Sequence, residues 1–199
     1  DQPRSRGLGD VYKRQLLTGS NASGKSTFMK AVAINLILAQ TIDTATADEF
    51  SYQPGLVYTS MANADDVLSG DSYFMAELKS IRRLFDIGTG TPVYCFIDEI
   101  FKGTNTTERI AASESVLTYL HELPQYRVIA ATHDIELSEL LKPNYLNYHF
   151  NETIEHHEIH FDYKIKEGKA NTRNAIELLR ITRFPDKIYN RAKQQVRDQ

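Results

Sequence analysis

Eight residues near the start of the chain carry the pattern with the clearest chemical meaning. Residues 19–26 read GSNASGKS and fill every required position of G-x-x-x-x-G-K-[ST]. In such a loop, backbone N–H groups and the start of the next helix converge on a phosphate, which the lysine also pairs with. A glycine-rich turn with a capping serine is the plainer alternative. The residues expected to bind a nucleotide are Gly19, Ser20, Asn21, Ala22, Ser23, Gly24, Lys25, Ser26 and Thr27.

Hydrolysis of a bound nucleotide needs a metal ligand and a base, and an acidic pair supplies both. Asp98 and Glu99 directly follow the apolar run VYCFI. We expect Ser26 and Asp98 to hold Mg²⁺ and Glu99 to polarise the attacking water as a general base. His133 follows a second apolar run, where it could donate a hydrogen bond to the γ-phosphate or simply occupy a loop or helix cap.

Short apolar runs alternate with longer amphipathic stretches and predict the elements that position these residues. Strands are expected at 16–19, 56–59, 93–97 and 128–131, and helices at 25–40, 72–85 and 108–120. This alternation predicts an α/β fold with a mainly parallel sheet flanked by helices, and ligands bind such sheets at the carboxyl edge. Beyond Pro143 we expect a hairpin formed by 145–150 and 154–165, and then two helices at 173–182 and 185–196.

Composition excludes several classes of protein. The 199 residues carry a net charge of −3, one cysteine and no apolar run near the ~20 residues of a membrane span. Residues 1–15 are expected to be a non-native leader or a disordered basic arm, with a single domain from 16 to 199. Without those 15 residues the net charge is −5. This charge argues against a chain that holds nucleic acid by bulk positive charge alone, and a local basic patch is the alternative that stays open.

Four segments in order resemble the ATPase domain of the MutS family of DNA mismatch repair proteins, an ABC-like P-loop ATPase. They are residues 18–27 (TGSNASGKST), 63–77 (NADDVLSGDSYFMAE), 96–108 (FIDEIFKGTNTTE) and 131–140 (ATHDIELSEL). The resemblance implies ATP and Mg²⁺ as cofactors and a homodimer that sandwiches two ATP molecules. It also implies that Ser72 reaches the γ-phosphate held by the neighbouring subunit, although an ordinary helix cap is the alternative for that serine.

The resemblance further implies a cytoplasmic, nucleoid-associated DNA repair role, with DNA held by upstream regions that are absent from this chain. Phe101 and Lys102 stand where the family usually has small or basic residues, and Asn105 stands where serine is common, which is typical of a divergent branch. Two rival functions stay open. One is another ABC-like ATPase of the transporter or chromosome-organising type, and the other is a nucleotide-binding fragment that is inactive without its upstream domains.

Two further groups of residues are given the plainer of two interpretations. His156, Glu158 and His160 could ligate zinc, but the solvated face of a half-buried strand explains them better. The basic residues of the last two predicted helices are likewise interpreted as a solvated face rather than as a DNA or partner contact. The apolar residues of the same helices leave a dimer contact open as an alternative; they are Ile176, Leu179, Ile188 and Val196.

Overall fold

Six strands and six helices make up the described part of the chain. The computed structural model describes residues 14–20, 23–61, 73–88, 90–155, 158–170 and 175–197. The strands are β1 (Arg14–Thr18), β2 (Leu56–Ser60), β3 (Val93–Asp98), β4 (Tyr126–Thr132), β5 (Tyr145–Glu155) and β6 (Glu158–Glu167). The helices are α1 (Lys25–Ile42), α2 (Tyr73–Leu84), α3 (Thr106–Glu122), α4 (Ile135–Leu140), α5 (Ala175–Ile181) and α6 (Asp186–Arg197).

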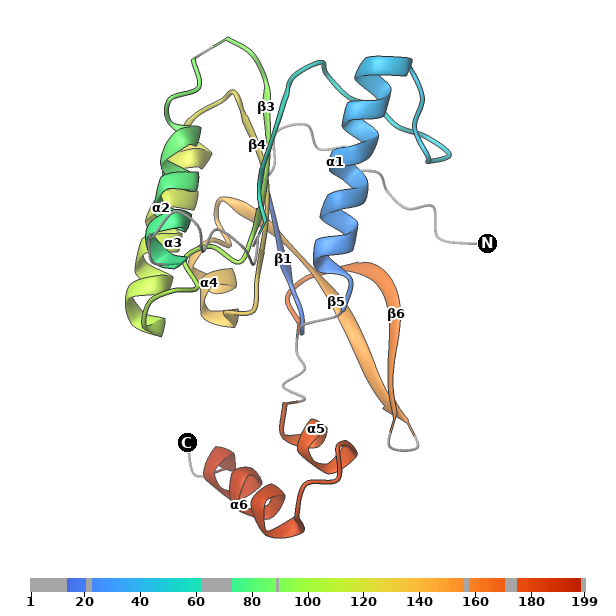
Figure 1. Cartoon of the computed structure of the whole chain (residues 1–199), viewed down its shortest axis with the longest axis vertical. Helices are drawn as coiled ribbons and strands as arrows, with labels where there is room; N and C mark the ends of the chain where they lie inside the picture. The colour runs from blue at the N-terminus through green and yellow to red at the C-terminus, as the bar shows by residue number, and fades with distance from the viewer. Residues whose placement is uncertain are drawn as a thin grey trace.

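The strands form one mostly parallel sheet, which confirms the predicted α/β class. Their order is β2-β3-β4-β1-β5-β6, in which neighbours from β2 through β5 are parallel and β6 is antiparallel to β5. Helix α1 covers one face, whereas α2, α3 and α4 cover the other (Figure 1). Parallel strands require such crossovers, because a helix must carry the chain back to the start of the next strand.

The central strands β1, β3 and β4 are buried on both faces, and their side chains alternate between two cores. In β3, Cys95 and Ile97 belong to the core beneath α2 and α3, whereas Phe96 packs with Leu17 and Met29 in the core beneath α1. This explains why β3 reads as a continuous apolar run rather than as an alternating one. Within the described residues, no helix is both long and apolar enough to cross a membrane.

Before the hairpin, the elements match the predicted ones closely, with two informative differences. Strand β1 begins at Arg14, two residues before the expected start, and Arg14 is buried with Nη2 donating to the carbonyl oxygen of Leu123 at 2.8 Å. Helix α4 was not predicted. With only six residues it is too short to show a helical period, although it is the element that follows His133.

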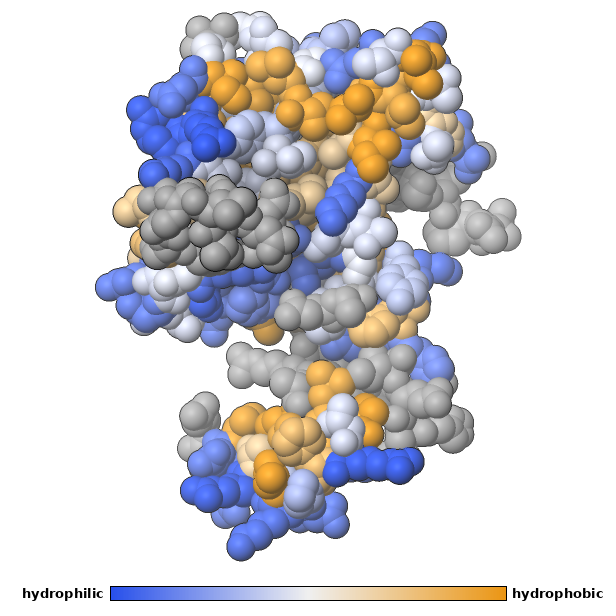
Figure 2. All heavy atoms as spheres, in the orientation of Figure 1, coloured by the Kyte–Doolittle hydropathy of each residue, from blue (hydrophilic) through white to orange (hydrophobic). Residues whose placement is uncertain are grey.

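The C-terminal part contains the expected hairpin and two helices, but the predicted strand bounds were wrong: the expected break at 151–153 lies inside β5, and β6 begins at Glu158 rather than at Ile154. The pairing of β5 with β6 shifts its register between Phe150 and Glu152, where β6 carries two extra residues. Helices α5 and α6 pack on each other at the end of the molecule, beyond the hairpin (Figure 1). Exposed apolar side chains gather on these two helices and around α1 (Figure 2).

Candidate functional site

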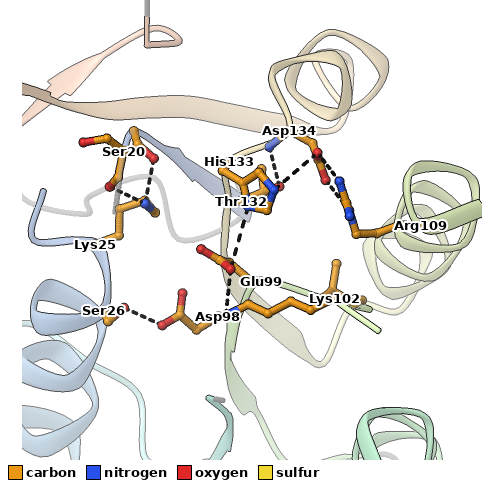
Figure 3. A network of polar contacts seen from close by, with 12 residues as sticks. Ser20, Lys25, Ser26, Asp98, Glu99, Lys102, Arg109, Thr132, His133 and Asp134 are labelled. Carbon is orange, nitrogen blue, oxygen red and sulfur yellow. Dashed lines mark hydrogen bonds and ion pairs between the residues drawn. The ribbon is translucent and has the colours of Figure 1, made fainter. Parts of the chain in front are cut away.

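The carboxyl ends of three neighbouring strands meet at one edge of the sheet. Strand β4 lies between β3 and β1, with Asp98 opposite Ala131 and Thr18 opposite Thr132. The loop after β1, the acidic pair after β3 and the histidine after β4 therefore emerge side by side. Figure 3 shows Lys25, Ser26, Asp98, Glu99 and His133 around this common space. The structure thus brings together the described site residues that the sequence predicted.

The loop after β1 has the backbone conformation that its glycines permit. Gly19 and Gly24 have φ angles of 140° and 109°, a region that other residues adopt only with strain. A Cβ atom on Gly19 would also lie 2.9 Å from the carbonyl oxygen of Phe150. Helix α1 begins at Lys25, so the free N–H groups of its first turn point to the loop. The loop is therefore shaped to receive an anion at a helix start.

Lys25 folds back over the loop. Its Nζ donates to the carbonyl oxygens of Gly19 at 2.7 Å and of Ser20 at 2.8 Å, and only 4% of the residue is exposed. Burial lowers the pKa of Lys25, and the nearby carboxylates of Glu99 and Asp98 oppose that shift. An ammonium group held away from water interacts strongly with a phosphate that approaches it.

Ser26 and Asp98 together offer a small oxygen site. The hydroxyl of Ser26 donates to Oδ2 of Asp98, so the first turn of α1 and the end of β3 are in direct contact. Hydroxyl and carboxylate oxygens are donors that suit Mg²⁺, which binds through one or two protein oxygens and substrate phosphates. The two side chains therefore fit the metal expected from the sequence.

Glu99 has two positively charged or ionisable neighbours. Oε2 of Glu99 lies 2.7 Å from Nζ of Lys102 and 3.7 Å from Nδ1 of His133. His133 is the largest cause of a Glu99 pKa lowered to about 2, with Lys102 adding to it and burial opposing it. The carboxylate is thus ionised at neutral pH, as a general base must be. Lys102 was noted in the sequence only as a departure from the family, although its i,i+3 spacing from Glu99 is one that can bring two side chains together.

The turn that carries Glu99 is strained and packs against α2. Glu99 and Phe101 have φ angles of 55° and 62°, which cost non-glycine residues roughly 1–3 kcal/mol each. The ring of Phe101 packs edge-on against Phe74 of α2, with centroids 6.0 Å apart. A Cβ atom on Gly103 would lie 2.6 Å from Cβ of Phe74. The start of α2 therefore packs tightly on the acidic turn.

A pocket of about 280 Å³ opens beside the loop. It is lined by Ser20, Ser23, Gly24, Lys25, Ser26, Thr27, Glu99 and Tyr163. The Oγ atom of Ser23 is buried and finds no hydrogen-bond partner among the described residues, so a polar group is available on the pocket wall. Tyr163, which is 65% exposed, comes from β6 and was not predicted from the sequence. Glu152, also missed, lies in β5 beside the register shift and accepts a hydrogen bond from Ser20.

Several predicted residues lie outside the described part of the chain. These are Asn21, Ala22 and Ser72, so the trans role of Ser72 stays a prediction. His156 of the considered zinc trio is also outside it. Among the described residues, no group of three histidine, cysteine, aspartate or glutamate side chains could hold a metal ion. The magnesium site above differs in kind, because a hydroxyl and one carboxylate form it.

Comparison with known proteins places this geometry in a family. Residues 15–198 match the family model of MutS domain V. The DNA mismatch repair protein MutS of Streptococcus equi subsp. equi (strain 4047) is 33% identical over 194 residues, which cover 96% of this chain and 23% of that protein. MutS of Listeria welshimeri is 33% identical over 180 residues, or 89% of this chain and 21% of that protein. The chain spans less than a quarter of the length of these relatives, and it belongs to the MutS domain V family.

Proposed function

We propose that this chain binds and hydrolyses ATP with Mg²⁺ as the motor domain of a DNA mismatch repair protein. The observation that carries the proposal is the convergence of Lys25, Ser26, Asp98, Glu99 and His133 on one edge of the sheet (Figure 3). A phosphate-binding loop alone supports only binding. An ionised carboxylate beside that loop adds the base that hydrolysis requires.

Each residue has a defined part in the proposed reaction. The loop amides and Lys25 hold the phosphates, and Lys25 exchanges its two carbonyl partners for phosphate oxygens. Ser26 and Asp98 would hold Mg²⁺, which supplies charge neutralisation for the β- and γ-phosphate oxygens. Glu99 accepts a proton from the attacking water, and His133 donates a hydrogen bond to the γ-phosphate.

Lys102 and His133 must release Glu99 before it can act on water. Because its pKa is held near 2, the Glu99 carboxylate is a weak base while both contacts are in place. The negative γ-phosphate competes with Glu99 for the ammonium group of Lys102 and for the ring N–H of His133, and so draws both side chains away from Glu99. Binding of ATP would in this way raise the basicity of Glu99 at the moment when a water molecule is positioned.

The assembly and the DNA role follow from membership of the family rather than from any base-contacting residue in this chain. Two copies close around two ATP molecules, each completing the other's site with Ser72. Closure controls a DNA clamp that other regions of a longer protein form, in the cytoplasm and on the nucleoid. The family match favours this function over the transporter and chromosome-organising alternatives.

Binding of a fluorescent ATP analogue to this chain, with Mg²⁺ and with EDTA, tests the proposal. The wild type should bind more tightly with Mg²⁺, and Lys25→Ala should abolish most of the binding. Lys30→Ala is the matched control, since Lys30 is exposed farther along the same helix. Phosphate release then separates an ATPase from a fragment that only binds nucleotide. Equal binding by wild type and Lys25→Ala would refute the proposed site.

A further inference from the structure

A shielded ion pair lies beside the proposed catalytic residues and has no part in the function proposed above. Arg109, in the first turns of α3, donates from Nε and Nη2 to Oδ2 and Oδ1 of Asp134, both at 2.8 Å. The two side chains are only 14% and 10% exposed. Two parallel hydrogen bonds between a guanidinium and a carboxylate fix the orientation of both planes. The Asp134 carboxylate is therefore held in one position.

Asp134 occupies a helix cap without acting as one. It precedes α4, yet its side chain makes no capping hydrogen bond to that helix, although aspartate is a preferred cap. Its backbone N–H donates to Oγ1 of Thr132 at 3.0 Å. The turn is thus anchored on both sides of His133, by Thr132 before it and by the Arg109 pair after it.

The ring of His133 lies between two carboxylates. Nδ1 is 3.7 Å from Oε2 of Glu99, and Nε2 is 3.7 Å from Oδ1 of Asp134 (Figure 3). Glu99 is the largest cause of the raised pKa of His133. Asp134 adds to the shift, whereas burial and the charge of Arg109 oppose it. Because both distances exceed a hydrogen bond, the ring can turn toward either carboxylate. Asp134 is therefore a competitor of Glu99 for the same ring.

We propose that Arg109 is a positioning residue for ATP hydrolysis, which holds the carboxylate of Asp134 and so leaves the ring of His133 to Glu99 and the γ-phosphate. The inference rests on the proposed function, because that function assigns His133 to the nucleotide. Without Arg109, the Asp134 carboxylate, which is 10% exposed, loses its bidentate partner, and Nε2 of His133, 3.7 Å away, can approach it as a hydrogen-bond donor. The ring then turns away from the catalytic side.

Kinetics of two variants distinguish this role from a purely structural one. Arg109→Ala should lower kcat about tenfold or more, with a smaller change in KM for ATP, because misplacement of a catalytic group costs such factors. Adding Asp134→Asn should recover most of kcat, since the amide carries no charge to attract His133. If the Arg109–Asp134 ion pair only joins α3 to the turn before α4, the double variant should not recover kcat, because it also lacks the ion pair. Absence of recovery would therefore overturn the proposal. Arg82→Ala is the control, because Arg82 is exposed and pairs with Asp86 one turn away.

Nuclear magnetic resonance of the His133 ring gives a readout that does not depend on turnover. Arg109→Ala should raise the pKa of His133, and the double variant should bring it back toward the wild-type value. The charged groups that face this ring are Glu99, Asp134 and Arg109, and Lys102 acts through Glu99. An unchanged His133 titration in Arg109→Ala would contradict the proposal.

Arg109→Lys covers the case in which the alanine variant does not fold. It keeps the charge but loses the bidentate geometry, and it should give an intermediate kcat. A wild-type kcat in a folded Arg109→Lys variant would count against the importance of that geometry. If the wild type fails to bind ATP, the proposed function fails, whereas the His133 titration still shows whether Arg109 controls the ring.

Discussion

Replacing Glu99 by glutamine separates the effect of this residue on the rate of ATP hydrolysis from its effect on folding stability. The change keeps the size of the side chain and removes its charge. Oε2 of Glu99 lies 2.7 Å from Lys102, whose side chain is one-third exposed and can turn to water. An amide oxygen can still accept a hydrogen bond from Lys102, so we expect a loss of about 1 kcal/mol in the free energy of unfolding. Loss of a general base costs far more, typically 10²–10⁴ in rate, or about 3–5 kcal/mol of barrier.

The assay compares ATP binding, phosphate release and urea unfolding of wild type and Glu99→Gln at pH 7.5. ATP affinity should be unchanged or tighter, because a negative charge near the γ-phosphate has been removed. Phosphate release should fall by at least ~100-fold. A stability loss of ~1 kcal/mol leaves a domain of ordinary stability folded, so unfolding cannot explain such a fall. Glu136→Gln, an exposed change in α4, is the control. Equal turnover by Glu99→Gln and wild type would refute the assignment of the base.

Three further predictions concern Ser72, Gly103 and the pair of Glu99 with His133. If Ser72 acts in trans, phosphate release per subunit should rise with protein concentration in the wild type and much less in Ser72→Ala; a rate that is flat in the wild type would contradict the dimer. Gly103→Ala should lower the free energy of unfolding by about 1–3 kcal/mol in urea, since its Cβ would lie 2.6 Å from Cβ of Phe74, whereas Gly88→Ala meets no atom within 4 Å and should be neutral. The Glu99 and His133 pair should stabilise the fold most between about pH 4.5 and 6.5. Its contribution is lost above that range as pH passes the raised pKa of His133, and below it as pH falls toward about 2. Urea unfolding of wild type and His133→Gln across pH 3–9 checks this, and a pH-independent difference would contradict it.

Much of the fold was predictable from local patterns. The parallel strands are buried on both faces, so Val93, Cys95 and Phe96 form a continuous apolar run that is easy to recognise. The glycine pattern before Lys25 marked the start of α1 to the residue. Helix α4 was not predicted, because six residues form less than two helical turns and show no clear periodicity.

Site residues were predictable only where they belong to a short motif whose residue types indicate the chemistry. Lys25, Asp98 and Glu99 follow apolar strands in recognisable contexts, and the sheet brings them together. The bidentate pair of Arg109 with Asp134 joins residues 25 positions apart, and no periodicity relates the face of α3 to the turn after β4. Tyr163 reaches the pocket because the hairpin folds back over the loop, which depends on tertiary packing.

A crystal structure of the Glu99→Gln variant with ATP and Mg²⁺ would show directly where the nucleotide binds. We expect the γ-phosphate within hydrogen-bond distance of Nζ of Lys25, with the His133 ring facing it. We also expect Mg²⁺ on the Ser26 hydroxyl, with Asp98 bound directly or through water. A nucleotide bound elsewhere on the chain, or a γ-phosphate turned away from the carboxyl edge of β3, would refute the proposed site.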